Sequence, residues 1–98
     1  MAYELLVSPV AFNDTEEAYL FYESKQAGLG ERFLQSVEAA YSKLSKTPQH
    51  YGFIGNKKDL RDIRVKHFPF VIVFQIISDQ VLVLRVFNTS RNPSSLKK

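Results

Sequence analysis

Two segments with a helical spacing of apolar residues lie on either side of the tripeptide Gly28-Leu29-Gly30. In the first segment the apolar side chains recur so as to predict a helix from about residue 10 to residue 26. The second carries one continuous apolar stripe and should end before Thr47-Pro48: Phe33, Leu34, Val37, Ala40, Tyr41 and Leu44. One glycine can take the left-handed conformation that ends a helix, and the next permits a tight reversal. Because so few residues separate the two segments, the helices must pack antiparallel as a hairpin.

Four further segments have the composition of β-strands. Residues 3–8 are mainly apolar and end at Ser8-Pro9, a pair that favours a helix start because serine caps it and proline lacks a donor that would be unpaired there. Residues 60–66 alternate loosely, residues 70–77 are almost wholly apolar, and residues 81–87 follow a turn. The predicted order is strand-helix-helix-strand-strand-strand. Its simplest packing is an α+β fold in which the helical hairpin covers one face of a small, mainly antiparallel sheet and leaves the other face free.

The length and the lack of cysteine exclude several classes of protein. A chain of 98 residues is one domain, residues 1–98. Without cysteine there are no thiolate metal sites, and the composition is compatible with a reducing cytoplasm. His50 and His67 lack the spacing of metal ligands, so we expect neither a metal nor a cofactor. The longest apolar stretch, residues 68–77, is far short of the roughly 20 residues of a membrane span, so we expect no membrane as partner.

Charge is distributed unevenly along the chain. Residues 1–49 carry four basic and seven acidic side chains, whereas residues 50–98 carry nine basic and three acidic ones. Five of the basic residues lie on or just beyond the last three predicted strands: Arg61, Arg64, Lys66, Arg85 and Arg91. Arginine holds phosphate oxygens with two parallel hydrogen bonds, so this set could bind a nucleic-acid backbone. Alternatively, some of the set could form surface ion pairs with Asp59, Asp62 and Asp79.

The orientation of these cations depends on the strand periodicity. Arg64 alternates with apolar neighbours, so that it should lie on the free face of the sheet together with Asp62 and Lys66. Arg85 instead shares one side of its strand with Val81 and Val83. Periodicity alone therefore does not decide where Arg85 points.

Four short motifs, in this order along the chain, give the sequence a family resemblance. They are Gly28-Leu29-Gly30-Glu31-Arg32-Phe33-Leu34, Thr47-Pro48-x-x-Tyr51, Phe68-Pro69-Phe70, and Leu84-Arg85-Val86-Phe87-Asn88 followed by Arg91-Asn92-Pro93. Together they resemble the RelE/ParE superfamily of bacterial toxins over nearly the whole chain. The resemblance implies the α+β fold described above and a cytoplasmic protein. It also implies a type II toxin–antitoxin module of the plasmid-stabilisation kind, in which a cognate antitoxin from a neighbouring gene neutralises the toxin.

The resemblance implies two alternative activities. RelE-like toxins cleave messenger RNA on the ribosome with basic residues on the second strand, an arginine early in the third, and an arginine with a histidine or tyrosine near the C-terminus. That chemistry needs no metal, because a base activates the ribose 2′-OH and cations stabilise the charge that develops on the phosphate. ParE-like toxins lack this set and inhibit DNA gyrase by binding it.

The match to the nuclease set is partial. Arg64 lies where a basic residue of the second strand is expected, but Asp62 replaces its companion. Val71 stands in place of the third-strand arginine, and Asn88 stands where many relatives have a histidine. Asparagine cannot exchange a proton near neutral pH. Arg91 could match the C-terminal arginine.

Three hypotheses follow from this comparison. The preferred one is a ParE-like inhibitor of DNA gyrase. The alternatives are a RelE-like, ribosome-dependent endoribonuclease and a decayed member of such a module without toxicity. If the chain is a nuclease, the candidate catalytic residues are Arg64, Arg85 and Arg91; the candidate binding residues are Arg61, Lys66 and Asn88.

Overall fold

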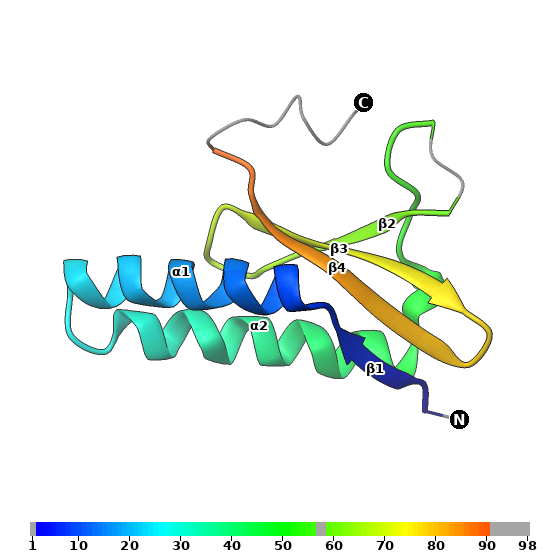
Figure 1. The fold of residues 1–98 in the computed structure, drawn as a ribbon, viewed down its shortest axis with the longest axis horizontal. Coiled ribbons are helices and arrows are strands. Elements are labelled where there is room, and N and C mark those ends of the chain that lie inside the picture. Colours follow the sequence, from blue (N-terminus) through cyan, green and yellow to red (C-terminus); the bar gives the residue numbers. More distant parts are fainter. Residues whose placement is uncertain (1, 57–58, 91–98) are drawn as a thin grey trace.

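The computed structural model describes residues 2–56 and 59–90, and the elements follow the predicted order (Figure 1). Strand β1 (Glu4–Val7) precedes helices α1 (Pro9–Lys25) and α2 (Leu29–Lys46) and a short 3-10 helix, η1 (Pro48–His50). Strands β2 (Arg61–Arg64), β3 (Phe70–Ile77) and β4 (Gln80–Asn88) complete the fold. Each prediction of a helix or strand is thus confirmed, with bounds that differ from the predicted ones by a few residues.

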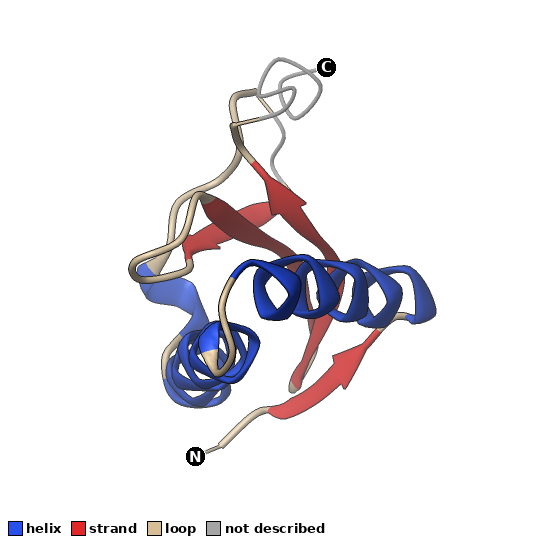
Figure 2. Cartoon of the chain, turned by 90° about the vertical axis from the view of Figure 1, so that its left-hand side faces the viewer, coloured by secondary structure: helices blue, strands red, loops and turns tan. Residues whose placement is uncertain are grey.

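The strands form one mixed sheet in the order β1-β4-β3-β2. Strand β1 runs parallel to β4, whereas β3 is antiparallel to both of its neighbours, β4 and β2. The two helices pack side by side against one face of this sheet (Figure 2). The α+β fold with a helical hairpin on a mainly antiparallel sheet is therefore confirmed.

Ser8 links the start of α1 to the edge of β4. Its Oγ accepts a hydrogen bond from the backbone N–H of Ala11 at 3.0 Å and so caps the helix. The same hydroxyl donates to the carbonyl of Leu84 at 3.0 Å, and the Ser8 N–H donates to the carbonyl of Val83 at 2.9 Å. The predicted helix start at Ser8-Pro9 is confirmed, and it also satisfies β4 where the pairing with β1 ends.

The reversal between the helices uses its two glycines for different reasons. Gly28 has a φ of +88°, which only glycine adopts without strain. A β-carbon at Gly30 would lie 2.8 Å from both Cδ1 and the carbonyl oxygen of Tyr19, so Gly30 allows the close approach of α1 and α2. The carboxylate of Glu23 accepts hydrogen bonds from the backbone N–H groups of Gly28 and Gly30, both at 3.0 Å. Glu23 therefore caps the start of α2, where N–H groups have no partner within the helix.

The main core lies between the helices and the sheet. The predicted stripe of α2 supplies the fully buried Phe33 and Leu44, and Val37 is 2% exposed. Tyr41 of the same stripe is only partly buried. At the far end of the hairpin, the rings of four residues pack with one another at centroid distances from 4.9 to 6.2 Å: Tyr22, Phe33, Phe68 and Phe70. These aromatic contacts attach the turn between β2 and β3 to the hairpin.

A β-bulge in β4 decides the orientation of Arg85. Val73 pairs with Arg85, whereas the next residue of β3, Phe74, pairs with Val83, so that Leu84 is an extra residue in β4. The extra residue reverses the alternation, so that Val83 and Val86 both belong to the main core. Arg85 is consequently exposed rather than directed into the core with Val83.

The sheet face opposite the helices, called the outer face below, is not free as predicted. Ile54 and Leu60, from the segment before β2, pack there against Val71 and Val73 of β3, and Phe87 of β4 joins them. The correction has a simple reason, because β3 is apolar on both sides and exposing its second side would cost about 25 cal/mol for each Å² of apolar surface.

Candidate functional site

The outer face contains much less free positive charge than the sequence predicts. Arg64 is exposed at the end of β2, and its register partner on β3 is Val71. Val71 is only 6% exposed because it packs against Ile54. The position at which the nuclease resemblance needs an arginine is thus part of a small apolar cluster.

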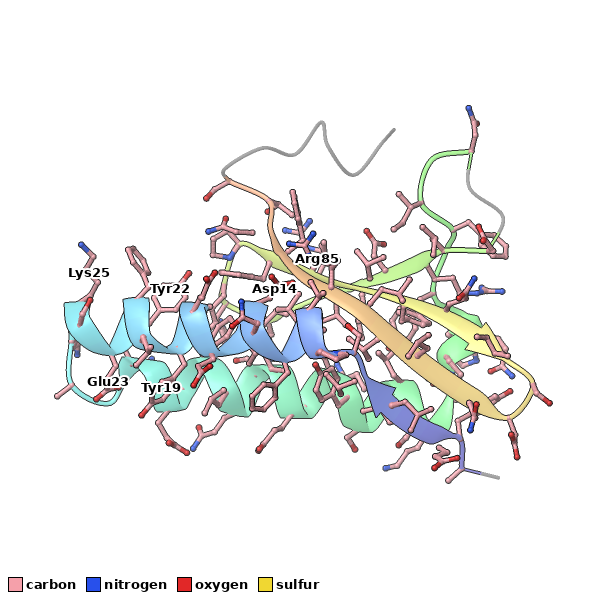
Figure 3. All side chains as sticks on the ribbon, in the orientation of Figure 1. Asp14, Tyr19, Tyr22, Glu23, Lys25 and Arg85 are labelled. Atoms are coloured by element: carbon pink, nitrogen blue, oxygen red, sulfur yellow. The ribbon has the colours of Figure 1, made fainter. Side chains whose placement is uncertain are left out.

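Arg85 is held by an acidic side chain of α1 (Figure 3). Its Nε and Nη2 donate to the two carboxylate oxygens of Asp14 at 2.7 and 3.2 Å. One of these oxygens also accepts the backbone N–H of Val86 at 3.0 Å. The hydrogen bond to Asp14 raises the pKa of Arg85 above its ordinary value, so the guanidinium keeps its positive charge. A guanidinium with this partner is poorly placed to hold a second anion.

Arg61, a predicted binding residue, anchors the segment that covers the outer face. Its guanidinium carbon lies 4.0 Å from the centroid of the Phe53 ring, and its Nη1 donates to the carbonyl of Tyr51 at 2.7 Å. Stacking and hydrogen bonding together fix the guanidinium within the protein. The structure therefore gives Arg61 a role in holding its own loop.

Two predicted residues of the C-terminal motif remain, Asn88 and Arg91, and the structure describes the first of them. Asn88 ends β4, and its Oδ1 accepts hydrogen bonds from the backbone N–H and the Oγ of Ser90 at 2.9 and 2.7 Å. This side chain closes the turn that follows the strand. Arg91 lies outside the described residues.

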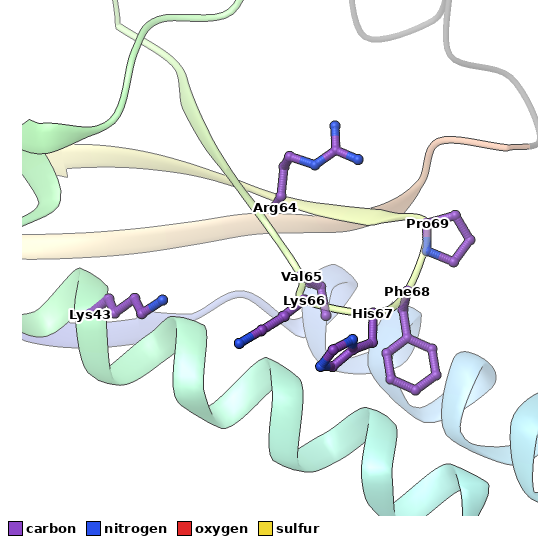
Figure 4. Close-up of a pocket in the computed structure, with 7 residues that line it drawn as sticks. All are labelled: Lys43, Arg64, Val65, Lys66, His67, Phe68 and Pro69. Atoms are coloured by element: carbon purple, nitrogen blue, oxygen red, sulfur yellow. The ribbon is translucent and has the colours of Figure 1, made fainter.

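Lys66 does not lie on the outer face with Arg64, and this prediction was wrong. Strand β2 ends at Arg64, and a turn begins in which His67 adopts a φ of +73°. The turn directs Lys66 and His67 towards α2, whereas Arg64 points away from the helix (Figure 4). There, Lys66 and His67 line a pocket together with Lys43 of α2. Lys43 was not among the predicted residues, because an exposed lysine in the last turns of a helix carries no local sign of a site.

Asp62 is the acidic group nearest to Arg64 along the strand. Burial raises the pKa of Asp62, and the positive charge of Arg64 acts in the opposite direction. Asp62 stands where the nuclease resemblance expects a basic companion of Arg64, and its charge offsets part of the charge of Arg64. Asp14, which neutralises Arg85, was missed because it is 71 positions away in the sequence.

No cluster of three potential metal ligands occurs within residues 2–56 and 59–90. His50 lies at the end of η1 and His67 in the turn before β3, so the two imidazoles belong to separate parts of the fold. Among the described residues, neither helix has the length and apolar character that crossing a bilayer would require.

Comparison with known families assigns the chain to a class of protein. A sequence model described as the ParE toxin of the type II toxin–antitoxin system parDE matches residues 5–93. The match covers most of the chain, so the chain belongs to the ParE toxin family. It is a toxin of the type II toxin–antitoxin class. No relative was found among the curated proteins.

Solved structures with the same fold include a ParDE system, a YoeB dimer and a further toxin. The chromosomal ParDE system from P. aeruginosa superimposes with a TM-score of 0.74 at 16% identity, over 89% of this chain and 96% of that one. The YoeB dimer from Staphylococcus aureus gives a TM-score of 0.60 at 12% identity, over 88% and 95%. A copper-bound mutant toxin from Helicobacter pylori gives 0.58 at 17% identity, over 92% and 98%. At such low identities these similarities establish the shared fold alone.

Proposed function

We propose that this toxin acts by binding and inhibiting DNA gyrase rather than by cleaving RNA. The observation that carries the proposal is the state of the outer face, where Val71 is buried and the guanidinium of Arg85 is bound by Asp14. An RNA-cleaving site needs several free cations around one phosphate and a group that exchanges a proton. Of the candidate residues within the described chain, only Arg64 offers a free guanidinium on this face.

The match to the family model supports the same proposal, because that model describes the ParE toxin of the parDE system. Inhibition by binding requires a surface and no reactive group. It is therefore compatible with Asn88, whose amide closes a turn and cannot serve as an acid or base.

The proposed partner in the cell is a cognate antitoxin, encoded by a neighbouring gene. Large apolar side chains on α1 and β1 are exposed, which is unusual for a monomer and is typical of a surface that a partner covers. They are Leu6, Val7, Val10, Phe12, Leu20 and Phe21, with exposed fractions between 38% and 66%. We expect the free toxin to gain thermal stability when the product of the adjacent reading frame is added, because binding to the folded state stabilises it.

Induced expression in bacteria tests the proposal. We expect replication to slow and the DNA damage response to rise while bulk messenger RNA remains intact. Primer extension on translated messages is the second readout. Cuts within codons that disappear in the Arg64→Ala variant would overturn the proposal in favour of the nuclease. Normal growth with abundant folded protein and no antitoxin would indicate a member of the family without toxicity.

A further inference from the structure

A pocket of about 610 Å³ lies between the C-terminal half of α2 and the turn that joins β2 to β3 (Figure 4). The side chains of Lys43 and Lys66 extend towards one another across it, from a helix and from a turn. His67 lies beside them, and Phe68 and Pro69 complete the wall on the side of β3. Arg64 contributes to the rim at the end of β2.

The charged residues that line this pocket are all basic. They are Lys43, Lys66 and, at the rim, Arg64, and the lining contains no carboxylate. Within residues 2–56 and 59–90 the ion pair recorded is that of Arg85 with Asp14, so neither Lys43 nor Lys66 has an acidic partner in that part of the chain. Exposed ammonium groups that approach one another repel, and an anion between them would turn this repulsion into attraction.

The turn that contributes Lys66 and His67 to the pocket also carries backbone N–H groups without an acceptor in the described chain. Within the described chain, no hydrogen bond occupies the backbone N–H of Lys66 or that of His67. His67 has a φ of +73°, in the left-handed region that histidine occupies more often than most residues other than glycine. Successive free N–H groups in a turn form a concave site for anions. The aromatic contacts of Phe68 with Tyr22 and Phe33 hold this turn in place on the hairpin.

The apolar side chains around the pocket indicate which class of anion fits it. A protein segment with acidic side chains usually anchors itself through apolar contacts as well. Of the apolar residues that line this pocket, Val65 is buried and the Phe68 ring packs on the hairpin, so that Pro69 is the one that is exposed. The large exposed apolar side chains of the described chain lie elsewhere, on β1 and α1, at Phe53 and at Ile77. A nucleic-acid backbone needs no apolar anchor, and lysines act on its phosphates as point charges.

We propose that this pocket, formed by Lys43, Lys66 and the Lys66–His67 turn, binds a phosphate of a nucleic-acid backbone. The inference goes beyond the proposed inhibition of gyrase, because the contact is with the nucleic acid itself and requires no second protein. It also differs from the nuclease hypothesis. Arg64 at the rim and Lys66 belong to the predicted catalytic and binding residues, but Lys43 and His67 belong to neither set, and the pocket lies on the side of β2 that faces α2.

The test measures binding of the full-length chain to a fluorescent DNA duplex of about 20 base pairs by anisotropy, between about 50 and 200 mM salt. A single-stranded RNA of the same length forms a second arm. The variants are Lys43→Gln and Lys66→Gln, and the matched control is Lys46→Gln. Lys46 is an exposed lysine of the same last turn of α2 and lines a different pocket. Melting curves establish that each variant is folded.

We expect Lys43→Gln and Lys66→Gln each to weaken binding about tenfold at about 0.1 M salt and to reduce the slope of log K against log salt by about one. The loss should occur in both the DNA and the RNA arm, because both ligands present the same phosphates. Lys46→Gln should leave affinity and slope close to those of the original chain.

Three results would overturn the proposal. The first is the absence of salt-dependent binding to either nucleic acid. The second is an equal loss in Lys46→Gln, which would indicate that net charge rather than the pocket holds the ligand. The third is tight binding of a glutamate-rich peptide that both pocket variants abolish, with no binding of nucleic acid, since this would assign the pocket to a protein partner.

Discussion

Asp14 in the second turn of α1 binds Arg85 of β4 through both carboxylate oxygens, and one of these oxygens also accepts the backbone N–H of Val86. The Asp14 side chain is 13% exposed, whereas that of Arg85 is 48% exposed. The carboxylate is therefore the more buried of the two charged groups. It satisfies a backbone donor at the edge of β4, beyond the last residue that pairs with β1.

The asymmetry of this contact predicts unequal effects of the two truncations. Asp14→Ala should lower the free energy of unfolding by about 1.5 to 3 kcal/mol, because it removes a charge-assisted hydrogen bond and leaves a backbone N–H without its partner. Arg85→Ala should cost less than about 1 kcal/mol, since exposed ion pairs contribute little. Urea denaturation measures both, with Glu17→Ala on the exposed side of α1 as the control. A larger loss in Arg85→Ala than in Asp14→Ala would contradict this assignment.

Glu23 provides a second prediction, because its carboxylate caps the start of α2 through Gly28 and Gly30. Glu23→Ala should destabilise the chain by about 1 kcal/mol, the usual cost of losing such a cap. Glu38→Ala, an exposed glutamate in the middle of α2, is the matched control and should change stability by no more than about 0.5 kcal/mol. Equal melting temperatures for the two variants would show that the cap contributes nothing.

Gly30 tests the close approach of the two helices. Alanine is the better helix former, yet its β-carbon would meet the side chain and the carbonyl oxygen of Tyr19 at 2.8 Å. We expect Gly30→Ala to destabilise the chain by roughly 1 to 3 kcal/mol, since overpacking outweighs the gain in helix propensity. At Gly52 a β-carbon would have nothing within 4 Å, so Gly52→Ala is the control. A Gly30→Ala variant as stable as the original would mean that the helices are further apart.

The partly buried phenol of Tyr41 should make the chain less stable in alkali. Burial raises the pKa of its phenol from 10.0 to about 12, with a hydrogen bond to Thr15 acting in the opposite direction. The stabilisation is fully present below about pH 10, where the phenol is neutral in both states. It is lost as the pH rises from about 10 towards 12, because the unfolded chain then releases the proton first. Urea denaturation at several pH values measures the free energy of unfolding. Between about pH 9 and 11 this free energy should fall less for Tyr41→Phe than for the original chain. An equal fall in both would contradict the prediction.

The fold could be predicted because each element carries its own local signal. The stripe through Phe33 and Val37 has the helical period, Ser8-Pro9 begins a helix, and residues 70–77 are too apolar for anything but a buried strand. These signals need only a few consecutive residues. The order of the elements then leaves few ways to cover the apolar surfaces.

The site could be predicted only in part, because its interactions join distant parts of the chain. No local pattern places Leu84 in a bulge or pairs Arg85 with Asp14, and both decide which cations remain free. Lys66 was predicted to continue the alternation of β2, but the strand ends two residues earlier and a turn brings Lys66 towards Lys43. The distribution of charge along the sequence identified the basic half of the chain. Only the three-dimensional fold shows which of its basic residues have partners within the protein and which line the pocket.

The central claim is that this toxin inhibits gyrase by binding. Its most direct test adds the purified chain to gyrase, relaxed plasmid and ATP and follows the appearance of supercoiled product. We predict that supercoiling falls as the ratio of toxin to gyrase rises and returns when the cognate antitoxin is added. Undiminished supercoiling with excess folded toxin, together with cleavage of messages on translating ribosomes by the same preparation, would contradict the claim.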